Sequence, residues 1–191
     1  THDKKLVEMS KNKILGLLEY FSRFENELGL LENLENWVFV EWSKANDDDF
    51  IKGVNFPSNM LYAKALEDAS ILLNDNNLLL KSQKIKEAIE QYSFNEEFYI
   101  DNMIRNDKKE FIKTDHITET CQYYAFYFHI ATKENHKELF ERMVTKFGPT
   151  RDYEKTYPNV YKSNVFIGDY LRLMILLEYG LSNEVYKETV D

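Results

Sequence analysis

The sequence predicts an all-α fold built from antiparallel helical hairpins, and three observations lead to this prediction. Apolar residues recur at i, i+3, i+4 and i+7 over most of the chain, which is the period of a helix packed on one side. Amphipathic helices alternate with helices that are apolar around most of their circumference. The connections alternate as well: they are short after each apolar helix and long before it.

Seven helices follow from this periodicity, with expected ranges 3–27, 58–73, 79–92, 116–131, 135–147, 164–179 and from about 182 onward. The first carries an apolar stripe that includes Ile14 and Phe21. The second begins after Pro57, where Ser58 or Asn59 can cap the free N–H groups of the first turn. The third is apolar on one side and carries Lys, Gln and Glu on the other.

The later helices differ in how much of their surface is apolar. Residues 116–131 and 164–179 are apolar nearly all round, which predicts burial on most sides. Residues 135–147 are amphipathic and are followed by Gly148 and Pro149, a common stop at a helix C-terminus. A last helix is expected to begin near Ser182 and to continue to the end of the given sequence.

The three long connections, at 28–57, 93–115 and 148–163, are expected to emerge at one end of the hairpins, beside the N-termini of the buried helices. Loops of this length are uncommon in compact domains and are usually functional. Alternation in the second loop suggests a short strand. The uneven spacing of the hairpins favours an α/α toroid over a solenoid, whose repeats have a fixed period.

Composition and charge limit the partners that the chain is expected to have. The chain has 191 residues, 43% hydrophobic and 30% charged, enough apolar material for a sizeable core. Its formal net charge of -9 argues against nucleic acid or an anionic membrane surface as the main partner. No apolar run approaches the ~18 residues of a membrane span. The N-terminal THDKKLVEMSK lacks the apolar core of a secretion signal, and a single cysteine leaves the compartment undecided.

The long loops combine aromatic side chains with carboxylates. The first loop holds both tryptophans of the chain, Trp37 and Trp42, beside Glu41 in the stretch ENWVFVEW. Aromatic rings stack on the apolar C–H faces of a sugar, and carboxylates accept hydrogen bonds from its hydroxyls. The alternative is that these aromatics only attach long loops to the helix ends. For the three loops together, the sequence leaves both interpretations open.

Glu119 is the most informative single carboxylate, because it lies in the first turn of the most apolar helix. Gln122 and Tyr123 follow at i+3 and i+4 and share its face. Free N–H groups at this helix end favour the ionised form of the carboxylate. The alternative is that Glu119 only complements the helix dipole.

The sequence predicts no metal or cofactor site. The four histidines lack metal-ligand spacing, and the six glycines form no phosphate loop. The run 47–49, DDD, fails the EF-hand pattern and is expected to be a solvated turn. Cys121 and His129 are both expected to be core residues.

Four segments, taken in order, resemble bacterial family-78 glycoside hydrolases, whose catalytic domain is the α-L-rhamnosidase-like (α/α)6 toroid. They are GLLENLENWVFVEW, GVNFPSNMLYAKALEDA, TETCQYYAFYFHIAT and SNVFIGDYLRLMILLEYG. The first resembles a family segment of the type GL…W.F.DW, and the third matches an inner helix that reads T.TQ.YA in many members. The resemblance implies that residues 1–191 form a single α/α-toroid domain or fragment, about half of the ring.

The resemblance implies inverting hydrolysis of terminal α-L-rhamnosides or similar glycosides, with an acid and a base carboxylate on opposite sides of the bond. In the family the acid lies in an Arg-Asp-Glu segment before this region and the base in a Trp-Glu segment after it. Neither motif is present, so the isolated chain is expected to lack catalytic residues and to be inactive. The implied sugar-binding residues are Glu41, Trp42, Glu119, Gln122 and Tyr123. Trp42 is the best match, whereas Glu41 replaces the usual Asp.

Two interpretations of function remain at this stage. One is a part of a glycoside hydrolase whose substrate is a carbohydrate. The other is a non-catalytic helical-repeat module that binds a protein or a glycan through its aromatic loop face. Half a ring leaves apolar flanks open, so a homodimer or contact with the missing remainder of the barrel is expected.

Overall fold

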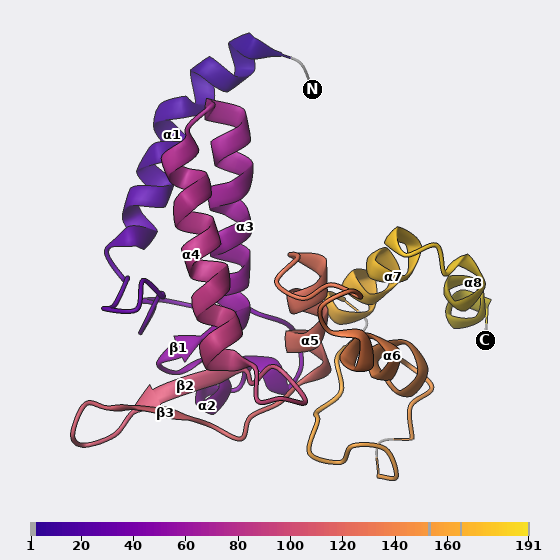
Figure 1. Cartoon of the computed structure of the whole chain (residues 1–191). Coiled ribbons are helices and arrows are strands. Elements are labelled where there is room, and N and C mark those ends of the chain that lie inside the picture. Colours follow the sequence, from indigo (N-terminus) through magenta and orange to yellow (C-terminus); the bar gives the residue numbers. More distant parts are fainter. Residues whose placement is uncertain (1–2, 153, 165, 191) are drawn as a thin grey trace.

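The computed structural model describes residues 3–152, 154–164 and 166–190, and this part of the chain is mostly helical (Figure 1). The helices are α1 Lys4–Ser22, α2 Asp48–Ile51, α3 Phe56–Leu73, α4 Asn76–Ser93, α5 Glu119–Tyr127, α6 Lys137–Lys146, α7 Gly168–Glu178 and α8 Ser182–Val190. A 3-10 turn, η1, covers Lys44–Asn46, and the strands are β1 Val54–Asn55, β2 Asn102–Arg105 and β3 Phe111–Lys113. None of the described helices has the length and apolar character needed to cross a membrane.

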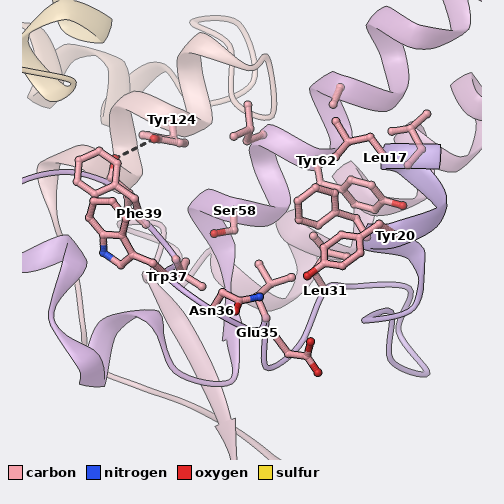
Figure 2. Close-up of a pocket in the computed structure, with 17 residues that line it drawn as sticks. Leu17, Tyr20, Leu31, Glu35, Asn36, Trp37, Phe39, Ser58, Tyr62 and Tyr124 are labelled. Carbon is pink, nitrogen blue, oxygen red and sulfur yellow. Dashed lines mark hydrogen bonds between the residues drawn. The ribbon is translucent and has the colours of Figure 1, made fainter. Parts of the chain in front are cut away.

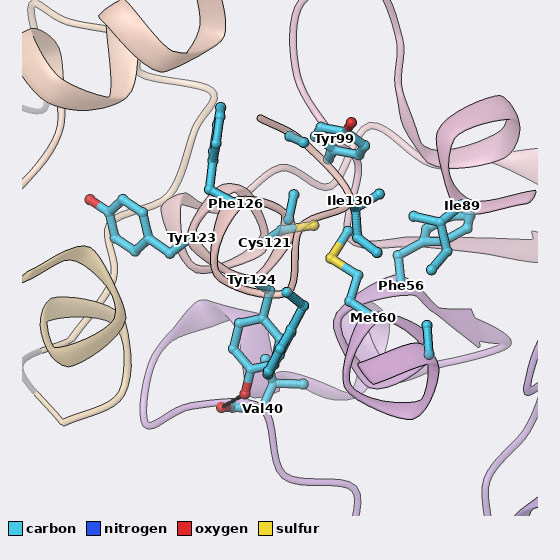
Figure 3. Packing of buried hydrophobic residues seen from close by; sticks show 14 of the residues in the cluster. Val40, Phe56, Met60, Ile89, Tyr99, Cys121, Tyr123, Tyr124, Phe126 and Ile130 are labelled. Carbon is cyan, nitrogen blue, oxygen red and sulfur yellow. Dashed lines mark hydrogen bonds between the residues drawn. The ribbon is translucent and has the colours of Figure 1, made fainter. Parts of the chain in front are cut away.

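The helices pack as hairpins around one hydrophobic core. Helix α3 packs against α1, α4 and α5, helix α5 packs against α7, and α7 packs against α8. Helices α1, α3 and α4 run side by side, and α5 to α8 lie at the other side of the molecule (Figure 1). Met60 of α3, Tyr123 and Phe126 of α5 and Ile89 of α4 belong to a single buried cluster (Figure 3). This continuous core positions the loops that connect the hairpins.

Helix α3 begins earlier than predicted, because its N-cap is a different residue. Asn55 is the cap, and its side chain accepts a hydrogen bond from the backbone N–H of Ser58 at 2.9 Å. Asn59, one of the two predicted caps, is buried and pairs instead with both backbone groups of Leu31, at 2.7 and 3.0 Å. The other end agrees with the prediction, since Asn74 closes the helix in the left-handed conformation at φ 52°.

Helix α5 is shorter than the predicted 116–131. Thr118 caps it by accepting a hydrogen bond from the backbone N–H of Cys121 at 3.0 Å, and Tyr127 is its last residue. Beyond this end His129 takes the left-handed conformation at φ 55° and is exposed, 3.7 Å from Glu178. The prediction of a core histidine is therefore wrong, because the chain has left the helix and its buried face. Cys121 lies in the core as predicted.

The remaining helices differ from the predictions mainly at their ends. Helix α1 stops at Ser22 rather than near residue 27, because the chain turns there into the first long loop. Helix α6 is close to the predicted 135–147, while α7 begins four residues later than predicted, at Gly168 rather than 164. Val165, inside the predicted range of α7, lies outside the described residues.

A small antiparallel sheet corrects the all-α prediction. Strand β1 comes from the loop between α1 and α3, and β2 and β3 come from the loop between α4 and α5. They pair in the order β1-β2-β3, with Val54 opposite Met103 and Met103 opposite Lys113. The sheet forms because long loops must satisfy their backbone hydrogen bonds away from any helix. It also joins the two loops at one end of α3 and α4 (Figure 1), where the short strand predicted in the second loop is found.

Candidate functional site

The three long loops meet at the first turn of α5, and each contacts a different residue of the sequence 118–120, Thr-Glu-Thr. We call the connections from α1 to α3, from α4 to α5 and from α6 to α7 the first, second and third loops. Thr118 binds the second loop, Glu119 binds the third and Thr120 binds the first. The start of the most buried helix thus holds all three loops together.

The second loop is held by a buried carboxylate. Asp101 accepts hydrogen bonds from the backbone N–H and the hydroxyl of Thr118, both at 2.7 Å. Burial raises the pKa of Asp101 to about 8, although the two bonds from Thr118 favour the ionised form, and the charge of Glu41 adds to the increase. One turn further along α5, Gln122 pairs with both backbone groups of Tyr99, at 2.8 and 2.9 Å.

The third loop is held by a buried ion pair. The Arg151 guanidinium donates to one oxygen of Glu119, and the two side chains are 0% and 1% exposed. The other oxygen of Glu119 accepts from the Tyr123 hydroxyl at 3.2 Å and from the Ser163 backbone N–H at 3.3 Å. Arg151 also donates to the backbone carbonyls of residues 156, 157 and 160, which closes the loop on itself. Burial raises the pKa of Glu119, and the Arg151 charge opposes that change.

The first loop is held by Glu41, which is completely buried. One carboxylate oxygen accepts from the hydroxyls of Ser43 at 2.8 Å and Thr120 at 2.5 Å, and the other accepts from the backbone N–H of Gly168. A Cβ atom at Gly168 would lie 2.6 Å from that second oxygen and 2.3 Å from the Cβ of Ser163. A glycine is therefore required where α7 begins, and Glu41 links the first loop to both α5 and α7.

The structure divides the five predicted sugar-binding residues into two groups. Glu41, Glu119, Gln122 and Tyr123 are brought together at the start of α5, but all four are buried and their polar atoms are bonded to protein groups. In this arrangement they hold the loops, a role that the sequence analysis considered only for the aromatic residues of the loops. Of the five, Trp42 alone is exposed, with 57% of its surface accessible.

Trp42 belongs to a group of three rings in the first loop, in which the two indoles are exposed and Phe39 is half-buried. The ring centroids of Phe39 and Trp42 are 4.9 Å apart, those of Trp37 and Phe39 are 5.2 Å apart, and those of the two indoles are 5.9 Å apart. Asn164 of the third loop donates a hydrogen bond to the backbone carbonyl of Trp42 at 2.5 Å. We call Trp37, Phe39 and Trp42 the aromatic cluster. It offers ring faces at the position where the first and third loops meet.

A groove with a volume of about 500 Å³ lies beside the aromatic cluster, between α1 and α3. Trp37 and Phe39 form one side of it, and Leu17, Tyr20 and Tyr62 form the other (Figure 2). The sequence analysis did not predict this groove, because its walls come from α1, the first loop, α3 and α5. The sign of this groove in the sequence is the concentration of aromatic residues near the end of the first helix.

Comparison with known proteins gives a relationship at the level of fold. No protein-family model matches the sequence, and no curated protein matches it. A solved structure of a GH78-family rhamnosidase of Bacillus sp. GL1 is similar over 98% of this chain, with a TM-score of 0.79 and 14% sequence identity. The chain spans 19% of the length of that protein. The fold of this chain is therefore similar to that of one part of this rhamnosidase, and the similarity is one of fold alone.

Proposed function

We propose that this chain is part of the catalytic domain of a glycoside hydrolase that hydrolyses terminal α-L-rhamnosides or similar glycosides. In this proposal residues 1–191 form one α/α domain, about half of an (α/α)6 toroid, and supply part of the sugar pocket. The acid and base carboxylates of an inverting mechanism come from other segments of the enzyme. The observation that carries the proposal is the exposed Trp42, held where the loops of a rhamnosidase-like fold converge.

The environment of Trp42 suits a sugar. Its exposed indole can stack on the apolar face of a pyranose, and a deoxysugar such as rhamnose adds a methyl group to that face. The backbone that carries the indole is held in place, because the neighbouring Glu41 side chain is bonded to Gly168 and the Trp42 carbonyl accepts a hydrogen bond from Asn164. Asp169, half-buried at the start of α7, provides a carboxylate near this junction, 3.4 Å from the Ser163 hydroxyl.

Saturation-transfer NMR with methyl α-L-rhamnoside tests this proposal on the chain as it stands. We expect transfer from the protein to the sugar protons, and little transfer to methyl α-D-glucoside. The Trp42→Ala variant should lose the transfer while Trp37→Ala retains most of it. Equal transfer to both sugars, or full transfer in Trp42→Ala, would contradict a sugar site at this position.

A hydrolysis assay tests the assignment of the catalytic residues. The isolated chain should not hydrolyse 4-nitrophenyl α-L-rhamnoside, because the residues gathered at the start of α5 are buried and bonded to the loops. Turnover that Glu119→Gln abolishes would show that Glu119 is a catalytic carboxylate rather than a support of the third loop.

A further inference from the structure

His116 lies at the end of the second loop, just before α5, and its imidazole is held by two neighbours. Its Nδ1 atom is 2.9 Å from the side-chain oxygen of Asn102, and its ring stacks on that of Phe50 with 4.2 Å between the centroids. The two rings are nearly parallel, at 15°. Asn102 and Phe50 are buried, whereas His116 is half-buried. The position and the plane of the imidazole are therefore both fixed, while part of the residue remains accessible.

The hydrogen bonds of Asn102 decide which imidazole nitrogen carries the hydrogen. The Asn102 amide nitrogen donates to the backbone carbonyls of Asp49 and Lys52, at 2.8 and 2.9 Å. The atom that faces His116 is therefore the amide oxygen, which can only accept. Nδ1 must donate to it, and this leaves Nε2 of the neutral imidazole as an acceptor. Within the part of the chain that the structure describes, no protein group forms a hydrogen bond with this Nε2.

Two further side chains approach the same Phe50 ring, so all three loops contribute to this place. Tyr161 of the third loop meets the ring edge to face at 5.6 Å, and the Lys44 ammonium of the first loop lies 5.6 Å from its centroid. Lys44 also lies 5.9 Å from the centroid of the Tyr161 ring. We call Lys44, His116 and Tyr161 the His116 group. It places an ammonium, an acceptor nitrogen and an aromatic ring around one buried phenyl ring.

The charges around the His116 group argue against an anionic ligand. The segment 44–52 holds three aspartates against two lysines, and Lys44 is itself paired with Asp47. A phosphate or a carboxylate would therefore find no net positive charge here. A neutral ligand with hydroxyl groups fits better, because a hydroxyl can donate to Nε2 of His116 and can accept from an ammonium.

The His116 group is adjacent to the proposed sugar site along two loops. Lys44 follows Trp42 by two residues in the first loop, so their Cα atoms are at most about 7 Å apart. In the third loop Tyr161 precedes Asn164 by three residues, and Asn164 bonds to the Trp42 carbonyl. A ligand at Trp42 is therefore close to a second, polar place of contact.

We propose that His116 is a ligand-binding residue, whose Nε2 accepts a hydrogen bond from a hydroxyl group of the sugar and whose ring is positioned by Asn102. This proposal takes the class of ligand from the proposed function and adds a second point of contact to Trp42. An imidazole that is already bonded at one edge and stacked on one face loses little freedom when a ligand binds. The contact favours sugars that carry a hydroxyl group at this position over sugars that lack it.

Two substitutions at residue 116 separate binding of a ligand from support of the loop. His116→Asn keeps a donor near the position of Nδ1 and can still bond to Asn102, but it has no atom in place of Nε2. His116→Gln extends its amide toward the position of Nε2 and gives up the bond to Asn102. Both variants lose the stacking on Phe50, so this loss does not distinguish them.

Titration of the full 191-residue chain with methyl α-L-rhamnoside measures the contact. The affinity should fall about three- to tenfold in His116→Asn, as for the loss of one hydrogen bond. His116→Gln should bind more tightly than His116→Asn, although it should be the less stable of the two in urea. His129→Asn is the control, because His129 lies near Glu178 and is 43% exposed, and its affinity should be unchanged. Full affinity in His116→Asn would overturn the proposal.

Nitrogen NMR of the imidazole gives a direct readout of the two nitrogen atoms. In the free chain, neutral His116 should carry its hydrogen on Nδ1, because Asn102 accepts it. Addition of methyl α-L-rhamnoside should shift the Nε2 resonance of His116 and leave that of His129 unchanged. A hydrogen on Nε2 in the neutral form, or an Nε2 resonance that does not respond to bound sugar, would overturn the proposal.

The outcomes separate failure of this proposal from failure of the proposed function. Weaker binding in Trp42→Ala together with full affinity in His116→Asn contradicts the His116 contact and leaves the site at Trp42 standing. An equal Nε2 shift in Trp42→Ala and in the unchanged chain supports the His116 contact and contradicts stacking on Trp42. A chain that does not bind the rhamnoside at all contradicts both.

Discussion

Glu41 and Trp42 are neighbours in the sequence, yet they lie in opposite environments. Glu41 is completely buried and accepts three hydrogen bonds, from the first loop, α5 and α7. Trp42 is more than half exposed, and its indole lies against the rings of Trp37 and Phe39 in the same loop. The comparison shows a division between a buried polar layer, which holds the loops, and an exposed aromatic surface next to it.

The buried layer has a physical reason. The three long loops bury apolar residues such as Leu31, Tyr99 and Val160. They also bury polar groups that need hydrogen-bond partners, and side chains at the start of α5 supply them. A buried carboxylate is costly unless hydrogen bonds or an opposite charge satisfy it. Asp101, Glu119 and Glu41 are each satisfied by a different loop contact, and among the described residues no buried side-chain nitrogen or oxygen lacks a partner. Substitutions in the two regions should therefore affect different properties.

The largest loss of stability is expected from Arg151→Met, because it leaves Glu119 buried without its ion-pair partner. Breaking a buried pair costs about 3–5 kcal/mol, which urea denaturation can measure. Lys155→Met is the control, since the pair of Lys155 with Asp152 in the same loop is 83% and 51% exposed and should contribute little. Similar losses in the two variants would mean that the third loop is not held by Arg151.

The next largest effect is expected from Gly168→Ala. The added methyl group would overlap Glu41 and Ser163, at 2.6 and 2.3 Å, and overpacking of this kind costs about 1–3 kcal/mol. Gly16→Ala in the interior of α1 is the matched control, because nothing lies within 4 Å of its added Cβ. That variant should gain about 0.5–1 kcal/mol. We therefore expect the denaturation midpoint to fall in Gly168→Ala and to rise in Gly16→Ala.

The raised pKa of Asp101 predicts that the free energy of unfolding depends on pH. Its pKa is about 8 in the folded protein and 3.8 for an aspartate in an unfolded chain, so the folded state retains a proton that the unfolded state releases. The contribution to stability is complete below about pH 4 and is lost progressively as the pH rises to about 8. Asp101→Asn should flatten the curve of unfolding free energy between about pH 5 and pH 8. An unchanged slope in the variant would show that Asp101 is ionised throughout.

The smallest change in stability is expected from Trp42→Ala, which should stay within about 0.5 kcal/mol, as at most exposed positions. The same substitution should weaken the binding of the sugar by about 1–3 kcal/mol, the range for an aromatic ring that stacks on its ligand. Thermal unfolding and titration of the rhamnoside measure the two effects on one sample. A large loss of stability would place Trp42 with Glu41 in the supporting layer.

The comparison also shows how far a sequence can identify a site. The segment with both tryptophans and the turn at 118–120 were singled out from residue types and spacing. Their roles were not separable in the same way, because a carboxylate that binds a sugar and one that holds a loop look alike in sequence. The exposed fraction and the hydrogen-bond partners distinguish them, and both depend on the packing of segments more than a hundred residues apart, such as Glu41 and Gly168.

The sequence by itself determined the helices, their alternation and the long loops between them, because periodicity and capping are local properties. It indicated the aromatic first loop and the buried character of α5 for the same reason. Only the tertiary structure decided that Glu41 is buried while Trp42 is exposed, that β1 pairs with β2, and that α1 and α3 enclose a groove with the first loop. These features arise from contacts between distant segments, and no short window of sequence contains both sides of such a contact.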